Sequence, residues 1–465
     1  MRQNIIAAIS TPPGKGGVAI IRVSGEGTFA LAERIFMPKS RKSIFDYPTR
    51  TQIYGDIISG GEPIDDGMLS LFKGPNSYTG EDMAEISCHG GTLITGLILE
   101  ELFALGAIPA EAGEFTRRAF IAGKLSLSDA EGIGQLLEAE SVEQIRLGSA
   151  ASRNHLKDKV EEISRRLTDL LSSVFARIDY PDEDLGELSN DEILTSLLEI
   201  KDDLGALLDT YSTGRAINEG IKATICGKPN AGKSTLYNAL IGEDAAIVTD
   251  MAGTTRDVLE RRTTLGRVAV TLSDTAGIRG GSSLDRVEAI GIERAKEQIE
   301  KSELLLALFD ATARLTPEDE EILSFLSDAR GTKICLINEK GKKPSRTAED
   351  MGIPADLFES ILYISPKEEP AAVKRELGAL ATRLFTDEKI TPLTDPIVST
   401  ARQHGALRAA IGFIDTAIDA YRIGLAADAA SSDIELALGA LAELDGRGVS
   451  ENVVDSIFRH FCVGK

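Results

Sequence analysis

The chain has 465 residues, more than one hydrophobic core usually organises, so about two to four domains are expected. Hydrophobic residues make up 42% and charged residues 27%, which are ordinary globular values, and the sequence has no long uncharged apolar run of the kind that spans a bilayer. The formal net charge of −22 argues against a protein that coats nucleic acid by bulk electrostatics, because such binding needs an excess of Lys and Arg. Any contact with RNA is therefore expected to be local.

The N-terminus and the cysteines indicate a cytoplasmic protein without a membrane partner. The first residues lack a long apolar stretch ending in a small-residue cleavage site, so export is not expected. The four cysteines lie far apart and form no paired metal-ligand spacing, which suits a reducing compartment. Neither a disulfide framework nor a zinc site is expected from Cys88, Cys226, Cys335 and Cys462.

Residue patterns in the first half of the chain predict two segments. Residues 1–118 are rich in Gly and Pro and carry short β-type runs at 17–23 and 68–72, which predicts a compact α+β domain. Residues 119–217 have apolar residues at three- and four-residue spacing, which predicts long packed helices. The helical patterns lie at 130–150, 156–178 and 193–208. A break at 180–184 is interpreted as an acidic interhelical loop rather than a functional segment.

In the second half of the chain, predicted strands first alternate with predicted helices, and a helical pattern then continues to the last residues. Residues 218–382 alternate apolar strands with helical stretches, the pattern of a parallel α/β sheet. The strands are expected at 222–226, 268–273, 304–309, 333–337 and 361–364. Residues 383–465 are Ala- and Leu-rich, with helices expected through 401–423 and 434–444. The α/β unit is thus expected to be inserted between two halves of a helical domain, which is tolerated when a domain's termini lie close together.

A glycine-rich phosphate-binding loop is the clearest motif. The sequence GKPNAGKS at 227–234 fits G-x-x-x-x-G-K-[ST] and lies between an expected strand and an expected helix. Backbone amides of such a loop wrap phosphates, and the helix N-terminus adds partial positive charge. Lys233 is expected to reach the β- and γ-phosphates, and Ser234 to ligate Mg²⁺. The nucleotide contacts expected here are Asn230, Ala231, Gly232, Lys233, Ser234 and Thr235.

Two further motifs follow in the order of the GTPase switches, GTTRD at 253–257 and DTAG at 274–277. Thr255 is expected to complete the Mg²⁺ shell, Asp274 to hold Mg²⁺ through water, and the Gly277 amide to sense the γ-phosphate. Alone, each motif is typical of a polar turn or a strand-end cap; together with the loop they predict a hydrolase. The expected contacts are Thr249, Asp250, Met251, Ala252, Gly253, Thr254, Thr255, Asp274, Thr275, Ala276 and Gly277.

The base-recognition motif departs from the usual pattern. The guanine clamp is ordinarily Asn-Lys-x-Asp after a strand, its carboxylate pairing with N–H groups of the base. Here NEKG stands at 338–341: Asn338 is in place, but Glu339 replaces Lys and Gly341 removes the acceptor. Ser365 begins a stretch that only approximates the loop that backs the base. Either a neighbouring acid such as Glu339 substitutes or the clamp is degenerate, and a weakened but retained preference for GTP is the favoured interpretation.

Three motifs occur together in this chain: the loop at 227–234, TDMAGTTRD at 249–257 and the terminal FCVGK at 461–465. On these residues the chain closely resembles the MnmE (TrmE) family of tRNA-modification GTPases, of the TrmE-Era-EngA-like class. The resemblance extends to TPPGKGG at 11–17 and GPNSYTGED at 74–82, and covers nearly the whole chain. It implies a multidomain fold with an N-terminal α+β folate-binding-like dimerisation domain, a discontinuous helical domain and an inserted Ras-like P-loop GTPase domain. The family's domain order matches the boundaries 1–118, 119–217, 218–382 and 383–465.

The resemblance implies a function in tRNA. The family acts on the wobble uridine with a flavin-dependent partner, MnmG, in a heterotetramer or larger assembly, and uses a tetrahydrofolate one-carbon unit to build an aminomethyl-type group such as 5-carboxymethylaminomethyl. It forms a homodimer through the N-terminal domains, where 5-formyltetrahydrofolate or a related folate binds. Its G domains meet face to face with K⁺ beside the nucleotide. The K⁺ ligands implied are Asn230, Thr249, Met251 and Thr254.

A monovalent cation beside the phosphates can neutralise developing charge where other GTPases use an arginine finger. By resemblance Glu288, in VEAIG at 287–291, orients the attacking water through a bridge. The chain is two residues longer than the family form between Gly277 and Glu288, so this assignment rests on the local match. Without the resemblance, Glu288 is typical of a solvated helix glutamate.

For folate, the resemblance implies Arg22, Glu85, Lys124 and Lys465. Arg and Lys suit the ligand's carboxylates, and a glutamate can accept pterin N–H bonds. Apart from the resemblance, Arg22 is typical of a strand-edge charge and Glu85 of a surface residue.

Cys462 matches the family's required cysteine, as a nucleophile or a proton carrier, whereas Cys226 and Cys335 are expected in the core. His89 is interpreted as a structural histidine rather than a helper at the folate site.

Two other functions are open at this stage. A regulatory GTPase of the ribosome-assembly kind would share the central domain but usually carries a basic RNA-binding module. A folate-dependent aminomethyl transferase would use the N-terminal domain and leave the GTPase domain idle. The terminal Cys-Val-Gly-Lys favours the tRNA-modification GTPase over the first of these.

Overall fold

The computed structural model describes residues 4–151, 153, 155–179, 189–242, 260–274, 296–341, 346–423, 427–459 and 461–465. Its contacts divide the chain into two compact units. The first consists of Met1–Glu138, Gly148–Lys201 and Ala406–Lys465, and the second of Ala139–Leu147 and Asp202–Gly405. Among the described residues, no helix combines the length and the apolar character needed to cross a membrane.

The first unit begins with a seven-stranded sheet in the order β3-β4-β5-β6-β2-β1-β7. All neighbours are antiparallel except β1 and β7, which run parallel. The predicted runs at 17–23 and 68–72 lie within β2 and β5. The strands are β1 (Ile6–Ile9), β2 (Gly16–Ser24), β3 (Phe36–Pro38), β4 (Gln52–Ser59), β5 (Glu62–Phe72), β6 (Met83–Gly90) and β7 (Ile108–Pro109).

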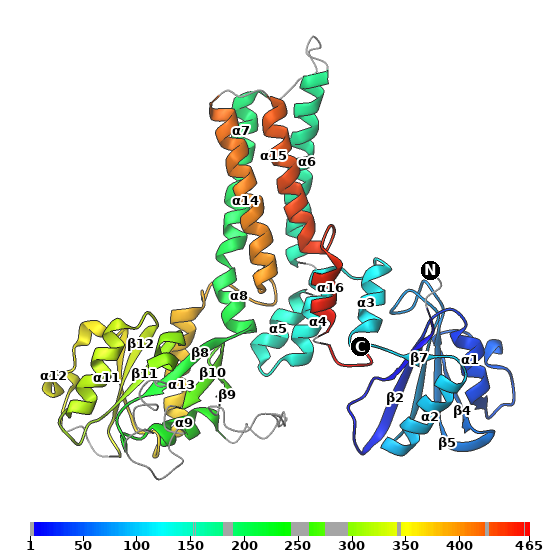
Figure 1. Cartoon of the computed structure of the whole chain (residues 1–465), viewed down its shortest axis with the longest axis horizontal. Helices are drawn as coiled ribbons and strands as arrows, with labels where there is room; N and C mark the ends of the chain where they lie inside the picture. The colour runs from blue at the N-terminus through cyan, green and yellow to red at the C-terminus, as the bar shows by residue number, and fades with distance from the viewer. Residues whose placement is uncertain are drawn as a thin grey trace. The chain divides into compact units, whose positions relative to one another are not determined.

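Two helices, α1 (Thr28–Ile35) and α2 (Thr92–Ala104), pack against one face of this sheet (Figure 1). In β2 the alternating residues Ala19, Ile21 and Val23 belong to that core. Because successive strand residues point to opposite faces, Arg22 lies on the other face, which also packs against helix α3 (Glu114–Ile121) through Phe115.

Helices form the rest of the first unit, as predicted, and α6 packs along α15 while α16 packs on α3 (Figure 1). Three of the helices given below, α5, α7 and α14, contain residues of both units. Apart from α1–α3 and the helices that cover the second sheet, described below, the helices are α4 (Leu127–Glu138), α5 (Val142–Ala151), α6 (His155–Asp179), α7 (Asn190–Asp209), α8 (Tyr211–Asn218), α14 (Ala401–Arg422), α15 (Ala427–Ala442) and α16 (Glu451–Phe458). The predicted interhelical loop at 180–184 lies outside the described residues.

The helical pattern predicted over 130–150 is two helices, not one. Helix α4 ends at Glu138, and α5 begins at Val142 after Ser141 accepts a hydrogen bond from the Gln144 amide at 3.2 Å. Ser141 followed by Gln144 is the spacing of a capping box, a helix-start signal inside the apolar periodicity. The turn brings Gly132 of α4 close to Ala151 of α5, where a side chain at 132 would collide with the Ala151 β-carbon at 2.5 Å.

The second unit holds a six-stranded sheet in the order β13-β12-β11-β8-β10-β9. Every pairing is parallel except that of β9 with β10, which confirms the predicted α/β sheet with its five strands. The strands are β8 (Ile221–Cys226), β9 (Glu260–Leu265), β10 (Val268–Asp274), β11 (Leu304–Asp310), β12 (Thr332–Asn338) and β13 (Ser360–Ile364). The sixth strand, β9, was missed because it reads ERRTTL, a charged pattern that suits an exposed sheet edge.

Helices cover both faces of this sheet (Figure 1). Leu304, Leu306 and Leu308 of β11 face a core shared with α9 (Lys233–Ile241) and α13 (Pro370–Phe385). The intervening residues of β11 face a second core, which is shared with α11 (Pro317–Asp328) and α12 (Ala348–Met351). Burial on both faces explains the continuous apolar run of this strand.

Candidate functional site

The phosphate-binding loop connects β8 to α9 at the carboxyl edge of the parallel sheet. Its two glycines meet backbone or side chains that leave no room for a β-carbon. A β-carbon at Gly227 would lie 2.5 Å from the Leu308 carbonyl, and one at Gly232 2.4 Å from Asn338 Nδ2. Asn230 has a left-handed backbone with φ +64°, a conformation that asparagine tolerates better than most residues. The sequence motif and the local geometry therefore both indicate a tightly packed phosphate-binding loop at this edge of the sheet.

Lys233 folds back over the loop. Its ammonium donates to the carbonyls of Gly227 at 2.7 Å and Lys228 at 2.9 Å. Ser234 and Thr235 are exposed in the first turn of α9, where backbone amides and the helix dipole favour an anion. These groups fit a nucleoside triphosphate with Mg²⁺: a lysine on the loop, a hydroxyl that can ligate Mg²⁺, and the N-terminus of α9, a helix of nine residues.

The base-recognition motif contacts the same loop. Asn338, buried at the end of β12, donates from Nδ2 to the Ala231 carbonyl at 2.8 Å. Its Oδ1 accepts the backbone N–H of Lys340 at 3.1 Å. Lys340 in turn donates to the Asn230 carbonyl at 3.2 Å and to Asp310 at 2.6 Å. Asn338 and Lys340 therefore attach the end of β12 to the phosphate-binding loop.

Asp310 ends β11, beside these residues. Burial raises the pKa of its carboxyl, but hydrogen bonds from Lys340 and Thr312 outweigh that effect, so the pKa lies below its usual value. Ser365 follows β13, and its carbonyl accepts the backbone N–H groups of Glu368 at 3.1 Å and Glu369 at 2.9 Å. The loops after β11, β12 and β13 thus meet at one edge of the sheet.

Several sequence-predicted residues lie outside the described part of the chain, and only the backbone of Asp274 is described. Asp274 is the last residue of β10 and pairs in register with Ile225 of β8, just before the phosphate-binding loop. The undescribed positions are Thr249, Asp250, Met251, Ala252, Gly253, Thr254, Thr255, Thr275, Ala276, Gly277 and Glu288.

A second candidate site lies in the first unit, where Arg22 of β2 and Glu85 of β6 face each other in register. The guanidinium contacts Glu85 Oε1 through Nε at 2.9 Å and Nη2 at 2.8 Å, and both side chains are half-buried. Arg22 also lies 5.5 Å from the Tyr78 ring centre and 5.6 Å from that of Phe115. β2 is an interior strand, so the interpretation of Arg22 as a strand-edge charge is wrong, and Glu85 is a paired rather than a free surface acid.

The C-terminal tail, residues 461–465, contacts the residues around Arg22. The Gly464 carbonyl accepts from Arg22 Nη1 at 3.3 Å and from Ser10 Oγ at 2.9 Å. The Phe115 N–H donates to the carbonyl of Lys465 at 3.2 Å, and Val463 forms a β-bridge with Ala112. The predicted residues Arg22, Glu85 and Lys465 are thus brought together.

The other two predicted residues of this site, Cys462 and Lys124, are both exposed. The Cys462 thiol is exposed on the same tail. Lys124, also exposed, donates from Nζ to the Pro75 carbonyl at 2.6 Å, in the GPNSYTGED stretch.

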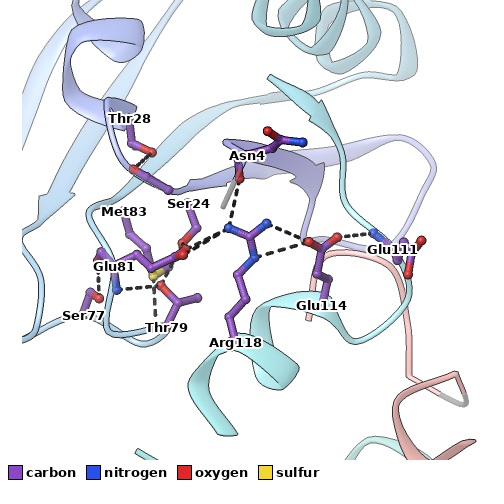
Figure 2. Close-up of polar contacts among 11 residues, drawn as sticks. Asn4, Ser24, Thr28, Ser77, Thr79, Glu81, Met83, Glu111, Glu114 and Arg118 are labelled. Atoms are coloured by element: carbon purple, nitrogen blue, oxygen red, sulfur yellow. Dashed lines mark hydrogen bonds and ion pairs between the residues drawn. The ribbon is translucent and has the colours of Figure 1, made fainter. Parts of the chain in front are cut away.

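The sequence analysis did not identify a buried arginine, Arg118, near the Arg22–Glu85 pair. Figure 2 shows Arg118 of α3 reaching Glu114 at 2.8 Å, Glu81 at 3.0 Å and the Asn4 carbonyl at 3.1 Å. Ser24 Oγ donates to the same Glu81 at 2.7 Å. Ser24 and Arg22 are two residues apart on β2 and share a face, so the two networks are neighbours. The i,i+4 spacing of Glu114 and Arg118 was the available signal.

His89 pairs with an acid on the sheet. Its Nδ1 lies 2.7 Å from Asp65 Oδ1, and its backbone N–H donates to Oδ2 at 2.8 Å. The hydrogen bond that the imidazole donates to the Asp65 carboxylate raises the pKa of His89. Burial raises the pKa of Asp65, but the bonds from His89 reverse this, and the net pKa is lowered.

Three of the four cysteines are buried. Cys226 and Cys335 lie in one apolar core, as predicted, and burial raises the pKa of each thiol to about 12. Cys88 lies in the N-terminal core with a pKa raised to about 11. Cys462 is the one exposed thiol among the four.

Comparisons with known proteins cover the whole chain. A family model described as GTP-binding protein TrmE N-terminus matches residues 5–124, and one described as MnmE helical domain matches residues 127–462. The tRNA modification GTPase MnmE of Clostridioides difficile (strain 630) is 37% identical over 463 residues, covering 100% of this chain and 99% of the relative. Its namesake from Thermotoga petrophila is 36% identical over 463 residues, covering 100% of both chains.

A solved structure of Era from Aquifex aeolicus bound to GDP.AlF4- covers 42% of this chain and 66% of its own, at 24% identity and a TM-score of 0.28.

Proposed function

This chain belongs to the MnmE (TrmE) family of tRNA modification GTPases, and we propose from that membership that its GTP cycle drives modification of the wobble uridine in tRNA. It is a GTP-hydrolysing enzyme of tRNA modification, and its family implies GTP and Mg²⁺. The single observation that carries the proposal is the phosphate-binding loop, closed between β8 and α9 and contacted by Asn338. Both full-length relatives carry the tRNA modification name, which favours this function over ribosome assembly or folate-dependent aminomethyl transfer.

Hydrolysis would proceed by positioning and charge neutralisation. Lys233 would hold the β- and γ-phosphates, Ser234 and Thr255 would ligate Mg²⁺, and Asp274 would hold the ion through water. Glu288 would orient the attacking water. The position of Lys233 over the loop, with its ammonium on two loop carbonyls, supports the first of these roles. The remaining contacts are those assigned from the sequence, including Thr235 and Ser365.

We propose K⁺ as a further cofactor, held by Asn230 together with Thr249, Met251 and Thr254. A monovalent cation beside the phosphates would neutralise charge that develops in the transition state. The position of Asn230 within the phosphate-binding loop, where it has φ +64°, supports this role.

The N-terminal site is proposed to bind a folate through Arg22, Glu85, Lys124 and Lys465. A guanidinium and an ammonium group suit carboxylates, and the paired Glu85 is an acceptor for pterin N–H groups. The tail bonds to Gly464 and Lys465 support a site shared with the C-terminus, next to the exposed Cys462. The folate would supply the one-carbon unit, and Cys462 would act there as a nucleophile or a proton carrier.

We propose the assembly and the segments on the same membership. The chain would form a homodimer through residues 1–118 and act in the cytoplasm with a flavin-dependent MnmG-type subunit on tRNA. Residues 218–382 would form the G domain, inserted between the helical segments 119–217 and 383–465.

The test is hydrolysis of GTP and ATP by the full chain, measured in K⁺ and in Na⁺. We expect K⁺-dependent hydrolysis that favours GTP. Equal rates in the two salts, or a preference for ATP, would contradict the mechanism. Glu288→Ala should leave nucleotide binding nearly intact while slowing turnover, and undiminished turnover would remove Glu288 from its role.

A further inference from the structure

The base-recognition motif lacks its usual carboxylate. Where the clamp reads Asn-Lys-x-Asp, this chain has Gly341 at the acidic position. The rest of the motif still functions as an attachment to the loop, because Asn338 contacts Ala231 and Lys340 contacts Asn230. A guanine bound beside Asn338 therefore needs an acceptor for its N1–H and exocyclic N–H groups from elsewhere.

A carboxylate lies beside Gly341. The β-carbon that a residue at 341 would carry lies 2.6 Å from Oε1 of Glu368 and 2.8 Å from its carboxyl carbon. Glu368 thus brings its carboxylate beside the place that the side chain of an aspartate at 341 would occupy. A residue with a β-carbon at 341 would require the Glu368 side chain to move.

The backbone holds both partners in this arrangement. β12 and β13 are parallel neighbours, so the loops that follow them leave the same edge of the sheet. Lys340 and Gly341 both have left-handed backbone, with φ +51° and +71°, which turns the chain sharply after β12. On the other loop, the Glu368 N–H donates to the Ser365 carbonyl at 3.1 Å. Glu368 itself is exposed, so its carboxylate is open to a ligand.

Glu339 is the less suitable acid. Its backbone N–H continues the ladder by donating to the Ile364 carbonyl at 2.9 Å. Successive residues along an extended chain point to opposite sides. Because Asn338 points toward the phosphate-binding loop, we expect the Glu339 side chain to point away from that loop.

We infer that Glu368 is the specificity-determining residue of the nucleotide site and accepts the N1–H and N2–H groups of guanine in place of the missing aspartate. Adenine offers an acceptor at N1 and no amino group at C2, so the same carboxylate would disfavour ATP. Lys340 would take the place of the lysine that the usual motif carries one residue earlier. The inference rests on the GTP binding proposed above and names the residue that selects the base.

Glu368→Gln in the full chain tests this inference through binding of GDP, xanthosine diphosphate and ADP, measured by titration calorimetry with Mg²⁺. Xanthine carries a carbonyl at C2 where guanine carries an amino group, so a glutamine amide can donate to it while its oxygen accepts N1–H. We expect the variant to bind GDP at least about tenfold more weakly and xanthosine diphosphate at least about tenfold more tightly than the parent chain does.

Two further variants complete the design. Glu339→Gln, a matched change one residue after Asn338, should leave all three affinities within about twofold. Gly341→Asp combined with Glu368→Ala should restore GDP selectivity, because an aspartate then stands at the usual position. Unchanged GDP binding in Glu368→Gln, or a switch to xanthosine diphosphate in Glu339→Gln, overturns the inference while GTP hydrolysis by the parent stands. A parent chain that binds no guanine nucleotide overturns the proposed function itself.

Discussion

Lys228 and Asp319 form an ion pair that ties the phosphate-binding loop to helix α11. Lys228 Nζ lies 2.6 Å from Asp319 Oδ2, and the exposed fractions of the two side chains are 14% and 2%. The same oxygen accepts the backbone N–H of Thr316 at 2.9 Å and its hydroxyl at 3.0 Å, which caps the helix. One carboxylate thus orders a helix start and a loop residue at once.

Asp319→Ala should lower the free energy of unfolding by about 3 kcal/mol, because it leaves a largely buried ammonium unpaired and removes a helix cap. GTP affinity should fall as well, since the loop loses its attachment to α11. Urea unfolding and nucleotide titration measure the two effects. Glu297→Ala, which breaks the exposed pair with Lys301, is the control and should change neither. Equal effects of the two variants would contradict this account.

The sequence predicted the residues of the loop but not this pair. G-x-x-x-x-G-K-S is read directly because backbone wrapping of phosphate demands those residue types at that spacing. The spacing of Thr316 and Asp319 likewise indicates a capping box. The partner of Asp319 is 91 residues away along the chain, and only the fold brings Lys228 to it. Arg118 was missed for the same reason, because its contacts with Glu81 and Asn4 are long-range.

At the scale of elements, the C-terminal tail is held by backbone geometry. Gly464 has φ +94°, and a β-carbon there would lie 2.3 Å from the Ile9 carbonyl. The carbonyls of Cys462 and Lys465 accept hydrogen bonds from the backbone N–H groups of Gly113, which precedes α3, and of Phe115 within α3. The tail therefore depends on one glycine for its close approach to β1.

Gly464→Ala should release the tail. Left-handed backbone costs a non-glycine residue about 1 kcal/mol, and the collision with Ile9 adds to this. Hydrogen exchange at the Gly113 and Phe115 amides should accelerate at least about tenfold. Gly448→Ala is the matched control, because Gly448 has φ +79° but nothing within 4 Å of its β-carbon position. Unchanged exchange in Gly464→Ala would show that the tail is not held at this residue.

The element pattern was predictable where burial enforces periodicity. The five predicted strands of the second unit's sheet each carry an apolar run, and this holds even for β13 at the sheet edge, whereas β9 reads ERRTTL and was missed. The division of 130–150 into α4 and α5 was missed because apolar spacing continues through the turn at Ser141. Capping residues, rather than periodicity, carry that information.

At the scale of the whole molecule, two sets of chemical groups belong to two compact units. The loop with Lys233 lies in the second unit, whereas Arg22, Glu85 and Cys462 lie in the first. An acidic chain of net charge −22 also limits tRNA contact to local basic groups in either unit. GTP hydrolysis and tRNA chemistry are therefore expected to be separable by mutation.

Cys462→Ser should leave GTP hydrolysis within about twofold of the parent rate, because its side chain is exposed and belongs to the unit that does not contain the phosphate-binding loop. It should nevertheless abolish formation of the modified uridine, since a hydroxyl replaces the only exposed thiol of the four cysteines. Hydrolysis is measured on the purified protein, and the modified nucleoside by mass spectrometry of tRNA from cells that depend on the variant.

Lys233→Ala is the converse change and should lower hydrolysis at least about 100-fold, because it removes a charge that stabilises the transferring phosphate. If the GTP cycle drives modification, this variant must also lose the modified nucleoside, although Cys462 is intact. Modification that persists in Lys233→Ala would separate the chemistry from the GTP cycle. Loss of hydrolysis in Cys462→Ser would instead mean that the tail acts on the nucleotide site, because substitution of an exposed thiol by a hydroxyl removes no core packing.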